Sequence, residues 1–442
     1  MFRRKIYREL LEWKNSSKSK TALLIEGARR VGKSTVAEEF AKNEYEKYIL
    51  IDFAYATDSV RDLFNDLSDL DYFFLQLQLQ YGVNLVEKNS LIIFDEVQFN
   101  PKARQAIKLL VADGRYDYIE TGSLISIKKN VENILIPSEE HKINMYPMDF
   151  EEFLWATGDI ETSQLLEKIY KNKISIGQEQ NRNMMRKFRL YMLIGGMPQA
   201  VQEYISSNNL EMVDRVKNEI IELYEKDFYK IDYTGQISEL YDSIPSELNK
   251  HSSAYQITSV IKNGNKESIM SKISELKSSK TVLTSYNVLD PNVGLSSMAN
   301  RNKFRLYLSD TGLLVSLMFK DREFTENIIY KKLLSDKLQS KLGILYENAV
   351  AQILVSKGHK LYYHTYLDKI KKRNYEIDFI IPKESKISPI EVKSSGYKVH
   401  KSLDNFSVKY SNRIKEKIVI YTKDLKIENN VTYLPIYLTM FL

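Results

Sequence analysis

A glycine-rich stretch near the N-terminus, GARRVGKST, constrains the fold of this chain more than any other feature. Its glycines Gly27 and Gly32 stand five positions apart, and Lys33 and Ser34 follow directly. Glycines at these positions let the backbone turn tightly, so that its N–H groups face a phosphate at the N-terminus of a helix. The apolar run TALLIEG predicts a buried strand before the stretch, and KSTVAEEFAKN predicts the helix after it.

The polar groups of this loop predict a nucleotide site. The ammonium of Lys33 is expected to reach the β and γ oxygens, and the hydroxyl of Ser34 to ligate Mg²⁺. Arg29 and Arg30 lie inside the loop, where they can contact phosphates. The predicted nucleotide-binding residues are Gly27, Ala28, Arg29, Arg30, Val31, Gly32, Lys33, Ser34 and Thr35.

A second apolar run, LIIFDEVQ, ends in the adjacent carboxylates Asp95 and Glu96. A buried strand that ends in this pair puts Asp95 where it can hold Mg²⁺, directly or through water, and Glu96 where it can polarise the attacking water. A later run, YDYIETGS, ends in Thr121 and Ser123; we expect Ser123 to sense the γ-phosphate or to orient the water. A solvated strand end could also carry Asp-Glu, but the phosphate loop upstream favours hydrolysis.

Strands alternate with helices over the first 160 residues. The run YILIDF supplies a further strand between the phosphate loop and the Asp-Glu pair. Alternation of this kind predicts an α/β fold with a parallel sheet, whose site lies at the carboxyl ends of the strands. We therefore expect a nucleotide-hydrolysing core at residues 1–160.

The motifs GARRVGKST, DEVQ, TGS, YPMDFEEFLWATG and IGGMPQAV resemble, in this order, those of a large bacterial and archaeal family of AAA-type P-loop ATPases. The resemblance covers nearly the whole chain. It implies ATP and Mg²⁺ as cofactors, a helical lid at residues 161–235, a C-terminal domain of unknown function and a homo-oligomer with shared sites. Many relatives show a Gly-Arg pair before YP-DFEEF. This chain reads IPSEEHKINMYPM there, so the source of any finger arginine stays open.

The segment at residues 236–320 changes from helical to strand-like patterns. IPSELNK, YQITSVIK and KESIMSKISELKSS fit helices, and TVLTSYNV fits a strand. Three helices followed by a β-wing describe a winged helix, whose third helix commonly enters a major groove. The family resemblance implies such a domain here. It either contacts DNA or packs on the ATPase and contacts none.

The last region, residues 321–442, carries a second set of polar residues with a chemical pattern. GILYENAVAQILVSKG predicts a helix with Glu347, YEIDFII a strand with Asp378, and SPIEVKSSG a strand on which Glu391 and Lys393 share a face. These parts resemble a PD-(D/E)XK nuclease fold. Asp378 and Glu391 would bind Mg²⁺ or Mn²⁺, Lys393 would position or activate water, and Glu347 would support the metal or its water.

The match to that pattern is incomplete. Ile377 stands where the proline of the pattern would be, and Glu376 beside it is an alternative ligand or a decoy. The alternative is a degenerate fold that is kept as a binding platform.

Composition adds a class of partner. Residues 301–442 hold 26 Lys and Arg against 15 Asp and Glu, a net charge of +11, whereas the first 300 residues carry −5. Such a region suits a polyanion such as nucleic acid, although lysine-rich solvated surfaces are also common. The chain has no cysteine and no apolar run of membrane-spanning length, so we expect a cytoplasmic protein without a membrane partner.

The sequence therefore predicts an AAA-type ATPase core with a helical lid, a winged-helix middle domain and a C-terminal α/β nuclease-like domain. We expect a Mg²⁺-dependent ATPase that couples ATP binding and hydrolysis to the binding of nucleic acid, namely DNA, and to its metal-dependent cleavage. The alternative is an ATP-dependent regulatory switch whose inactive nuclease-like domain only binds DNA or a protein. A protein-remodelling ATPase ranks last, because no stretch stands out as a pore loop.

Overall fold

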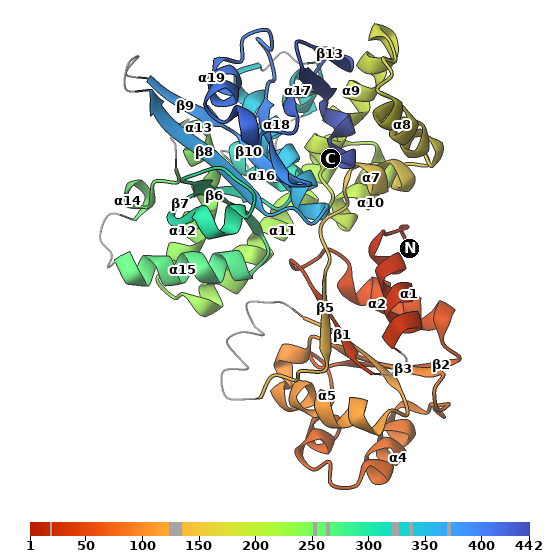
Figure 1. Ribbon diagram of the computed structural model, residues 1–442. Coiled ribbons are helices and arrows are strands. Elements are labelled where there is room, and N and C mark those ends of the chain that lie inside the picture. Colours follow the sequence, from red (N-terminus) through yellow and green to blue (C-terminus); the bar gives the residue numbers. More distant parts are fainter. Residues whose placement is uncertain are drawn as a thin grey trace. The chain divides into compact units, whose positions relative to one another are not determined.

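The computed structural model describes residues 1–17, 20–122, 135–250, 254–261, 266–320, 327–335, 339–368 and 373–442 (Figure 1). These residues form two compact units. The first comprises residues 1–146 together with 278–280, and the second comprises residues 147–277 and 281–442. Within the described ranges, no helix is long and apolar enough to cross a bilayer.

The first unit is built on a five-stranded parallel sheet with the order β2-β3-β4-β1-β5. The interior strand β3 is buried at every position, because neighbouring strands flank it and helices cover both faces of the sheet. The predicted α/β fold with a parallel sheet is thus confirmed. The strands are β1 (Ala22–Glu26), β2 (Lys47–Asp52), β3 (Ser90–Asp95), β4 (Asp117–Thr121) and β5 (Glu140–Asn144).

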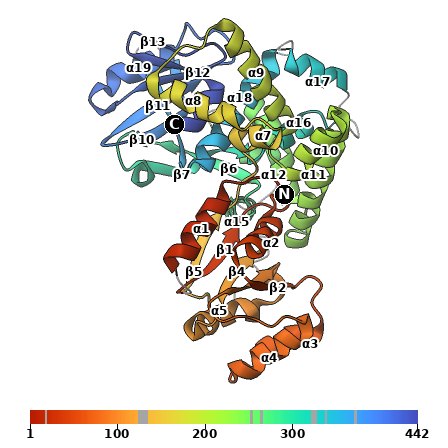
Figure 2. The ribbon, with the colours of Figure 1, turned by 90° about the vertical axis from the view of Figure 1, so that its right-hand side faces the viewer.

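Helices α1 and α2 lie on one face of this sheet and α5 on the other, as both ribbon views show (Figure 2). Phenylalanine rings fill the core next to α4: Phe64 makes edge-on contacts with Phe53, Phe73 and Phe94 at centroid distances of 5.2–5.5 Å. The helical elements are α1 (Ile6–Ser17), α2 (Lys33–Glu44), α3 (Asp58–Asp62), η1 (Leu63–Asn65), α4 (Leu70–Tyr81), η2 (Val97–Phe99) and α5 (Pro101–Asp113).

The second unit begins with α7, whose start is fixed by the motif YPMDFEEF. The N–H of Glu152 donates to Asp149 Oδ1 at 3.0 Å, and the N–H of Asp149 donates to Glu152 Oε2 at 3.2 Å, a reciprocal capping box. Helices α9, α10, α11, α16 and α17 then gather beside the strands (Figure 2). The helices are α7 (Phe150–Ala156), α8 (Glu161–Asn172), α9 (Gln178–Ile194), α10 (Pro198–Ser207), α11 (Leu210–Ile231), α16 (Thr311–Met318), α17 (Asn327–Leu334) and α18 (Gln339–Ser356).

The segment expected to be a helical lid of the ATPase core, residues 161–235, is indeed helical, but it belongs to the second unit. Its helix α9 packs on α16 and on the C-terminal turn η5 (Ile436–Phe441). Arg189 Nε donates to Tyr346 Oη at 3.1 Å, and Gln352 Nε2 donates to Tyr191 Oη at 3.0 Å. The apolar and polar faces of α9 are therefore used inside this unit, and a role as a nucleotide lid stays a prediction.

The motif IGGMPQAV forms a tight junction. The N–H of Gly196 donates to Asp310 Oδ2 at 2.6 Å, and a Cβ at Gly196 would collide with the backbone of Met148. Gly195 has φ 84, a left-handed conformation that glycine adopts readily. Glycines at these positions thus let three backbone segments meet in the core of the second unit.

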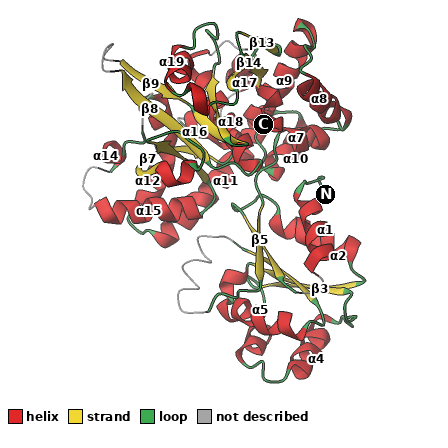
Figure 3. Cartoon of the chain, viewed as in Figure 1, coloured by secondary structure: helices red, strands yellow, loops and turns green. Residues whose placement is uncertain are grey.

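The strands of the second unit form two sheets, drawn in yellow in Figure 3. One is a four-stranded sheet of order β7-β6-β8-β9, and the other is five-stranded, of order β10-β11-β12-β14-β13. They comprise β6 (Val282–Val288), β7 (Ala299–Leu308), β8 (Leu361–Asp368), β9 (Arg373–Ile377), β10 (Phe379–Lys383), β11 (Lys386–Val392), β12 (Lys417–Tyr421), β13 (Lys426–Glu428) and β14 (Val431–Pro435).

The first of these sheets joins two regions that the sequence suggests are separate. Strands β6 and β7 follow the predicted helices of residues 236–320, and β6 pairs in parallel with β8 from beyond residue 320. The winged-helix and nuclease-like domains thus stay predictions, and the proposed boundary at residue 320 lies within one compact unit. The remaining helical elements are α12 (Gln236–Asp242), α13 (Ile244–Asn249), α14 (Ile257–Val260), α15 (Lys266–Ser278), η3 (Leu295–Met298), α19 (Lys401–Lys409) and η4 (Ser411–Arg413).

Glu120 on β4 is an ionisable group buried in the first unit, with 0% of its surface exposed. Beside it, Arg104 on α5 forms a two-point ion pair with Glu140, at 2.7 and 2.8 Å. Burial, and then the charge of Glu140, raises the pKa of Glu120 well above its usual value. Glu120 is therefore protonated in the folded unit under conditions in which it is ionised in the unfolded chain.

We expect the first unit to lose stability as the pH rises above about 4.5, the ordinary pKa of Glu120, and toward the raised pKa of the folded state. The unfolded chain then releases a proton that the folded unit keeps, which costs up to about 1.4 kcal/mol per pH unit. Glu120→Gln cannot ionise and should flatten this dependence. Urea unfolding followed by Trp13 fluorescence in a Trp155→Phe background measures it between pH 5 and 8.

The exposed Glu46→Gln of the same unit is the matched control, and its pH dependence should equal that of the parent. Equal slopes for Glu120→Gln and the parent would show that Glu120 is ionised in the folded unit.

Candidate functional site

The phosphate loop connects β1 to α2. Gly27 approaches β5 so closely that a Cβ there would collide with the carbonyl oxygen of Met145. Arg30 (φ 69) and Gly32 (φ 99) adopt left-handed backbone conformations and bring the chain to the start of α2 at Lys33. The free N–H groups of the first turn of α2 therefore point toward the loop, which suits an anion.

Lys33 is buried, and its ammonium donates to two carbonyl oxygens of its own loop, Gly27 O at 3.1 Å and Ala28 O at 3.0 Å. Burial lowers the pKa of Lys33 to about 8, although the charges of Glu96 and Asp95 oppose the shift. The Lys33 ammonium thus lies against its own loop. A bound phosphate, which carries a full negative charge, would attract it more strongly than these carbonyl oxygens do.

Asp95 is the centre of a small hydrogen-bond network at the carboxyl ends of the strands. Its Oδ1 accepts from the hydroxyl of Ser34 at 2.8 Å, from the N–H of Glu96 at 3.1 Å, and from the hydroxyl of Thr121. Ser34 comes from α2, Asp95 from β3 and Thr121 from β4, so the parallel sheet assembles the network. A serine hydroxyl beside a carboxylate is a donor set of hard oxygens, which fits Mg²⁺.

Glu96 follows Asp95 with a left-handed backbone (φ 51), which is strained for a residue with a side chain. Its carboxylate accepts a hydrogen bond from Gln98 Nε2. The chain thus turns at Glu96, directly after β3, and the carboxylate lies at the edge of the sheet. A residue that orients the attacking water must lie at this edge, next to the phosphate loop.

The other predicted residues of this site differ in their burial, and one of them lies outside the described residues. Ser123 lies outside the described residues, whereas Thr121, two positions earlier, contacts Asp95 directly. Ala28 and Val31 are buried, Arg29 is half-buried, and the remaining two loop residues, Arg30 and Thr35, are exposed. The exposed Arg30 is therefore accessible to a ligand.

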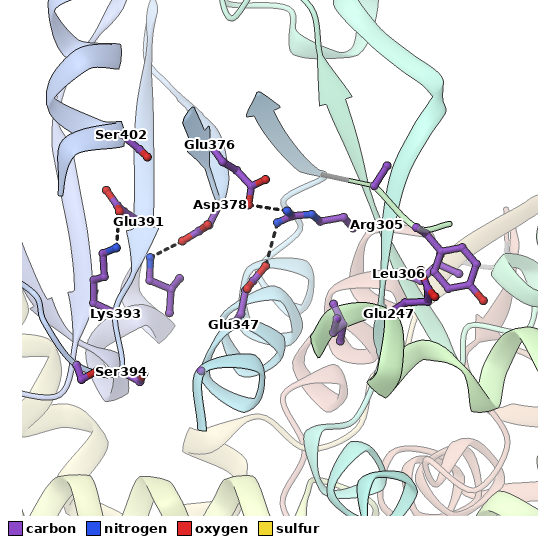
Figure 4. A pocket seen from close by; sticks show the side chains of 16 residues that line it. Glu247, Arg305, Leu306, Glu347, Glu376, Asp378, Glu391, Lys393, Ser394 and Ser402 are labelled. Carbon is purple, nitrogen blue, oxygen red and sulfur yellow. Dashed lines mark hydrogen bonds and ion pairs between the residues drawn. The ribbon is translucent and has the colours of Figure 1, made fainter. Parts of the chain in front are cut away.

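A pocket of about 340 Å³ lies in the second unit, and all four residues predicted for the nuclease-like site line it. Glu347 comes from α18, Asp378 from the bend between β9 and β10, Glu391 from β11, and Lys393 from the residues that follow β11. Figure 4 shows these side chains facing a common space. The pocket lining is Glu247, Leu248, Ala254, Tyr255, Arg305, Leu306, Gly343, Glu347, Glu376, Asp378, Glu391, Val392, Lys393, Ser394, Ser395 and Ser402.

One wall of the pocket is held by Arg305, a residue that the sequence did not single out. Its guanidinium forms ion pairs with Glu376 Oε1 at 2.5 Å and with Glu347 Oε1 at 3.3 Å. The hydroxyl of Tyr307 donates to the same oxygen of Glu347 at 2.5 Å. Arg305 and Tyr307 are two positions apart on β7, so they share a face, but no spacing in the sequence links that face to Glu347.

The opposite wall carries Asp378, Glu391 and Lys393. Asp378 Oδ2 accepts from the N–H of Val392 at 2.7 Å, which fixes the carboxylate beside β11. Lys393 Nζ lies 2.7 Å from Glu391 Oε1. The other oxygen of Glu391 is buried and has no hydrogen-bond partner among the described residues.

The pocket concentrates negative charge. Burial raises the pKa of Asp378 well above its usual range, and the charges of three neighbouring glutamates add to the shift. Burial also raises the pKa of Glu376, which the guanidinium of Arg305 partly offsets. Among the described residues, no group of three carboxylates or imidazoles stands ready to hold a metal. The unpartnered oxygen of Glu391 beside Asp378 nonetheless fits a divalent cation that takes its other ligands from water or phosphate.

Three family models match successive parts of the chain. An AAA domain matches residues 19–154, a domain of unknown function (DUF8612) matches residues 185–323, and a second domain of unknown function (DUF4143) matches residues 342–439. An uncharacterized protein of Methanocaldococcus jannaschii is 24% identical over 439 residues, covering 94% of this chain and 84% of the relative.

Solved structures give weaker likenesses. A Walker-type ATPase of Pyrococcus abyssi has a TM-score of 0.42 and 14% identity, covering 72% of this chain and 96% of that chain. The ORC1 protein of Aeropyrum pernix in complex with DNA has a TM-score of 0.29 and 12% identity, covering 76% and 93%.

The matches confirm a predicted AAA-type P-loop ATPase domain at residues 19–154 and a C-terminal domain of unknown function. The phosphate loop and the Asp-Glu pair of the first unit lie inside the matched AAA range. The acidic pocket takes Arg305 from the DUF8612 range and Glu347, Asp378 and Glu391 from the DUF4143 range.

Thr121→Val should raise the Mg²⁺ concentration needed for half-maximal ATP hydrolysis by about 10- to 100-fold, because it removes a hydroxyl that orients Asp95. Thr121→Ser keeps the hydroxyl and should stay close to the parent. A magnesium titration of ATP turnover compares the three proteins. Equal midpoints for the valine and serine variants would contradict the role of this hydrogen bond.

ATP binding near pH 8 should be accompanied by proton uptake, because the phosphates raise the pKa of Lys33 from about 8. At pH 8 about half a proton enters per nucleotide, and affinity falls as the pH rises further. Calorimetry in two buffers of different ionisation enthalpy measures the uptake. Lys33→Arg stays charged throughout and is the control; the same uptake in both proteins would exclude Lys33 as the source.

Proposed function

We propose that this ATPase couples the binding and hydrolysis of ATP to the binding of nucleic acid, namely DNA, and to its metal-dependent cleavage in the acidic pocket. The observation that supports this most is the meeting of Asp378, Glu391 and Lys393 in one pocket of the second unit. Carboxylates and a lysine from adjacent segments of a sheet are the groups that phosphodiester hydrolysis needs.

In the proposed ATPase reaction, the loop N–H groups and Lys33 hold the β- and γ-phosphates. Ser34 and Asp95 would hold Mg²⁺, whose charge stabilises the transferring phosphoryl group. Glu96 accepts a proton from the attacking water or orients it, and Thr121 keeps Asp95 in place through its hydroxyl. Ser123 remains our candidate for sensing the γ-phosphate.

In the proposed cleavage reaction, Asp378 and Glu391 would hold Mg²⁺ or Mn²⁺, which supplies positive charge to the phosphate in the transition state. Lys393, at 2.7 Å from Glu391, would orient a water molecule beside these carboxylates. Glu347 would complete the site through water, with its own position fixed by Arg305 and Tyr307. Ser402, at the start of α19, lines the same space and can donate a hydrogen bond to a phosphate oxygen.

A basic and aromatic surface adjoins the pocket and suits the path of a nucleic acid. The hydroxyl of Tyr366 donates to the carbonyl oxygen of Ser402 at 3.3 Å, so this ring lies next to a pocket residue. The ammonium of the exposed Lys409 lies 5.1 Å from the ring centres of both Tyr366 and Tyr410, and Arg413 lies 5.4 Å from Tyr410. Cations of this kind neutralise phosphates, and the rings offer stacking faces.

The second candidate is a regulatory switch that binds DNA or a protein without cutting it. The ion pairs of the pocket favour this candidate, because Glu391, Glu347 and Glu376 each have a cationic partner within the chain. A site whose carboxylates are satisfied internally can persist as a platform after catalysis is lost.

Cleavage of plasmid and single-stranded DNA, with Mg²⁺ or Mn²⁺ and with or without ATP, separates the two candidates. We expect the wild type to cut, and Lys393→Ala to lose at least about 100-fold in rate while ATP hydrolysis persists. Lys33→Ala should lose ATP hydrolysis by a similar factor and reveal whether ATP permits or restrains cleavage. The control is Lys426→Ala, which removes a half-buried lysine of the same region that pairs with Glu428.

Absence of cleavage together with salt-dependent DNA binding would favour the switch, since phosphate neutralisation releases counterions. Absence of both cleavage and DNA binding would overturn the nucleic-acid function and leave a protein partner.

A further inference from the structure

Arg305 is a buried cation of the pocket that neither the nuclease-like pattern nor the ATPase assigns. It lies on β7, in the part of the chain that precedes the nuclease-like segments, yet its guanidinium reaches their carboxylates. Only 7% of its surface is exposed. In Figure 4 it extends toward Glu376 and Glu347, on the side of the pocket away from Glu391 and Lys393.

The contacts of Arg305 hold it as a fixed cation. Two of its nitrogens pair with carboxylates on different elements, Glu376 at 2.5 Å and Glu347 at 3.3 Å. The guanidinium carbon lies 4.8 Å from the centre of the Tyr363 ring, and such stacking confines the group to one plane. A planar cation that bridges two carboxylates occupies the position between them at which a metal ion could otherwise bind.

The net formal charge of the pocket can be compared with the charge of the metal ions that it would bind. When all four are ionised, as a bound cation favours, Glu347, Glu376, Asp378 and Glu391 supply four negative charges, and Arg305 and Lys393 supply two positive ones. The remaining lining carboxylate, Glu247, pairs with Lys250 at 2.5 Å. Two negative charges are left, which is the charge that one divalent cation neutralises.

The carboxylate oxygens that remain available also favour one metal position. Glu347 and Glu376 are engaged by Arg305, whereas Asp378 has one oxygen bonded to Val392 N–H, and Glu391 has one oxygen at Lys393. The second oxygen of Glu391 is buried without a hydrogen-bond partner among the described residues. Unused acceptor capacity is therefore found on the side of the pocket that Arg305 does not reach.

We propose that the pocket binds a single divalent cation at Asp378 and Glu391, and that Arg305 occupies the place of a second one by bridging Glu347 and Glu376. This inference rests on the proposed metal-dependent function of the pocket. It makes Arg305 a positioning residue, since it acts through the carboxylates, and it assigns the pocket a one-metal chemistry.

The test counts bound Mn²⁺ in nucleotide-free protein by equilibrium dialysis and by the loss of the electron paramagnetic resonance signal of free Mn²⁺. The ions that belong to the pocket are those that Asp378→Asn loses relative to wild type. We expect this difference to be one. In Arg305→Gln it should rise to two, or the first ion should bind at least about tenfold more tightly, because a repelling charge has gone.

Two further variants match this change. Lys426→Gln removes a cation outside the pocket lining, which pairs with Glu428 at 2.5 Å, and should leave the count at one. Arg305→Lys keeps the charge and should also leave it at one. Circular dichroism checks that each variant is folded; if Arg305→Gln does not fold, the wild-type count still decides, since two pocket ions in the wild type would overturn the proposal.

The outcomes distinguish an error about the metal site from an error about the role of Arg305. If Asp378→Asn loses no ion relative to wild type, the metal site itself is wrong, and the proposed cleavage fails with it. If Asp378→Asn loses one ion but Arg305→Gln binds that ion with unchanged count and affinity, only the role of Arg305 is overturned. Loss of Mn²⁺ binding in folded Arg305→Gln would overturn it too, and would make Arg305 a support of the metal site.

Discussion

Charged side chains buried in the second unit require partners within it, and this requirement determines which helices and strands meet there. Arg305 joins β7 to α18 and β9 through Glu347 and Glu376. Lys217 on α11, which is fully buried, donates to the carbonyl oxygens of Leu193 and Gly312, and so ties α11 to α9 and α16. An unpaired ion in such surroundings costs several kcal/mol, so these contacts exclude packings in which the same apolar faces meet without them.

In the first unit, the parallel sheet brings short polar side chains together at one point. Parallel strands end at a common edge, so Asp95 at the end of β3 and Thr121 at the end of β4 meet without any long side chain. The phosphate loop leaves β1 at the same edge and delivers Lys33 and Ser34 with the first turn of α2. The resulting network is held by backbone geometry, whereas the pocket of the second unit is held by ion pairs.

This difference explains what the sequence could predict. The phosphate loop and the Asp-Glu pair are local patterns, and the structure brings them together as expected. The contact of Thr121 with Asp95 was not predicted, because it depends on β4 lying between β1 and β3, whereas the role of Ser123 stays a prediction. Arg305 could not be found by spacing, since it lies 42 residues before Glu347 and owes its role to tertiary pairing. The helices of residues 161–235 were predicted as helices, but their membership in the second unit depends on packing with α16 and η5.

The position of Arg305 also bears on how the two sets of motifs act in one chain. Residues 278–280 belong to the first unit, and β6 begins directly after them at Val282. Strand β6 pairs antiparallel with β7, in the register that places Ser285 opposite Arg305. The main chain thus runs from residues 278–280 directly into the strand that pairs with the strand of Arg305.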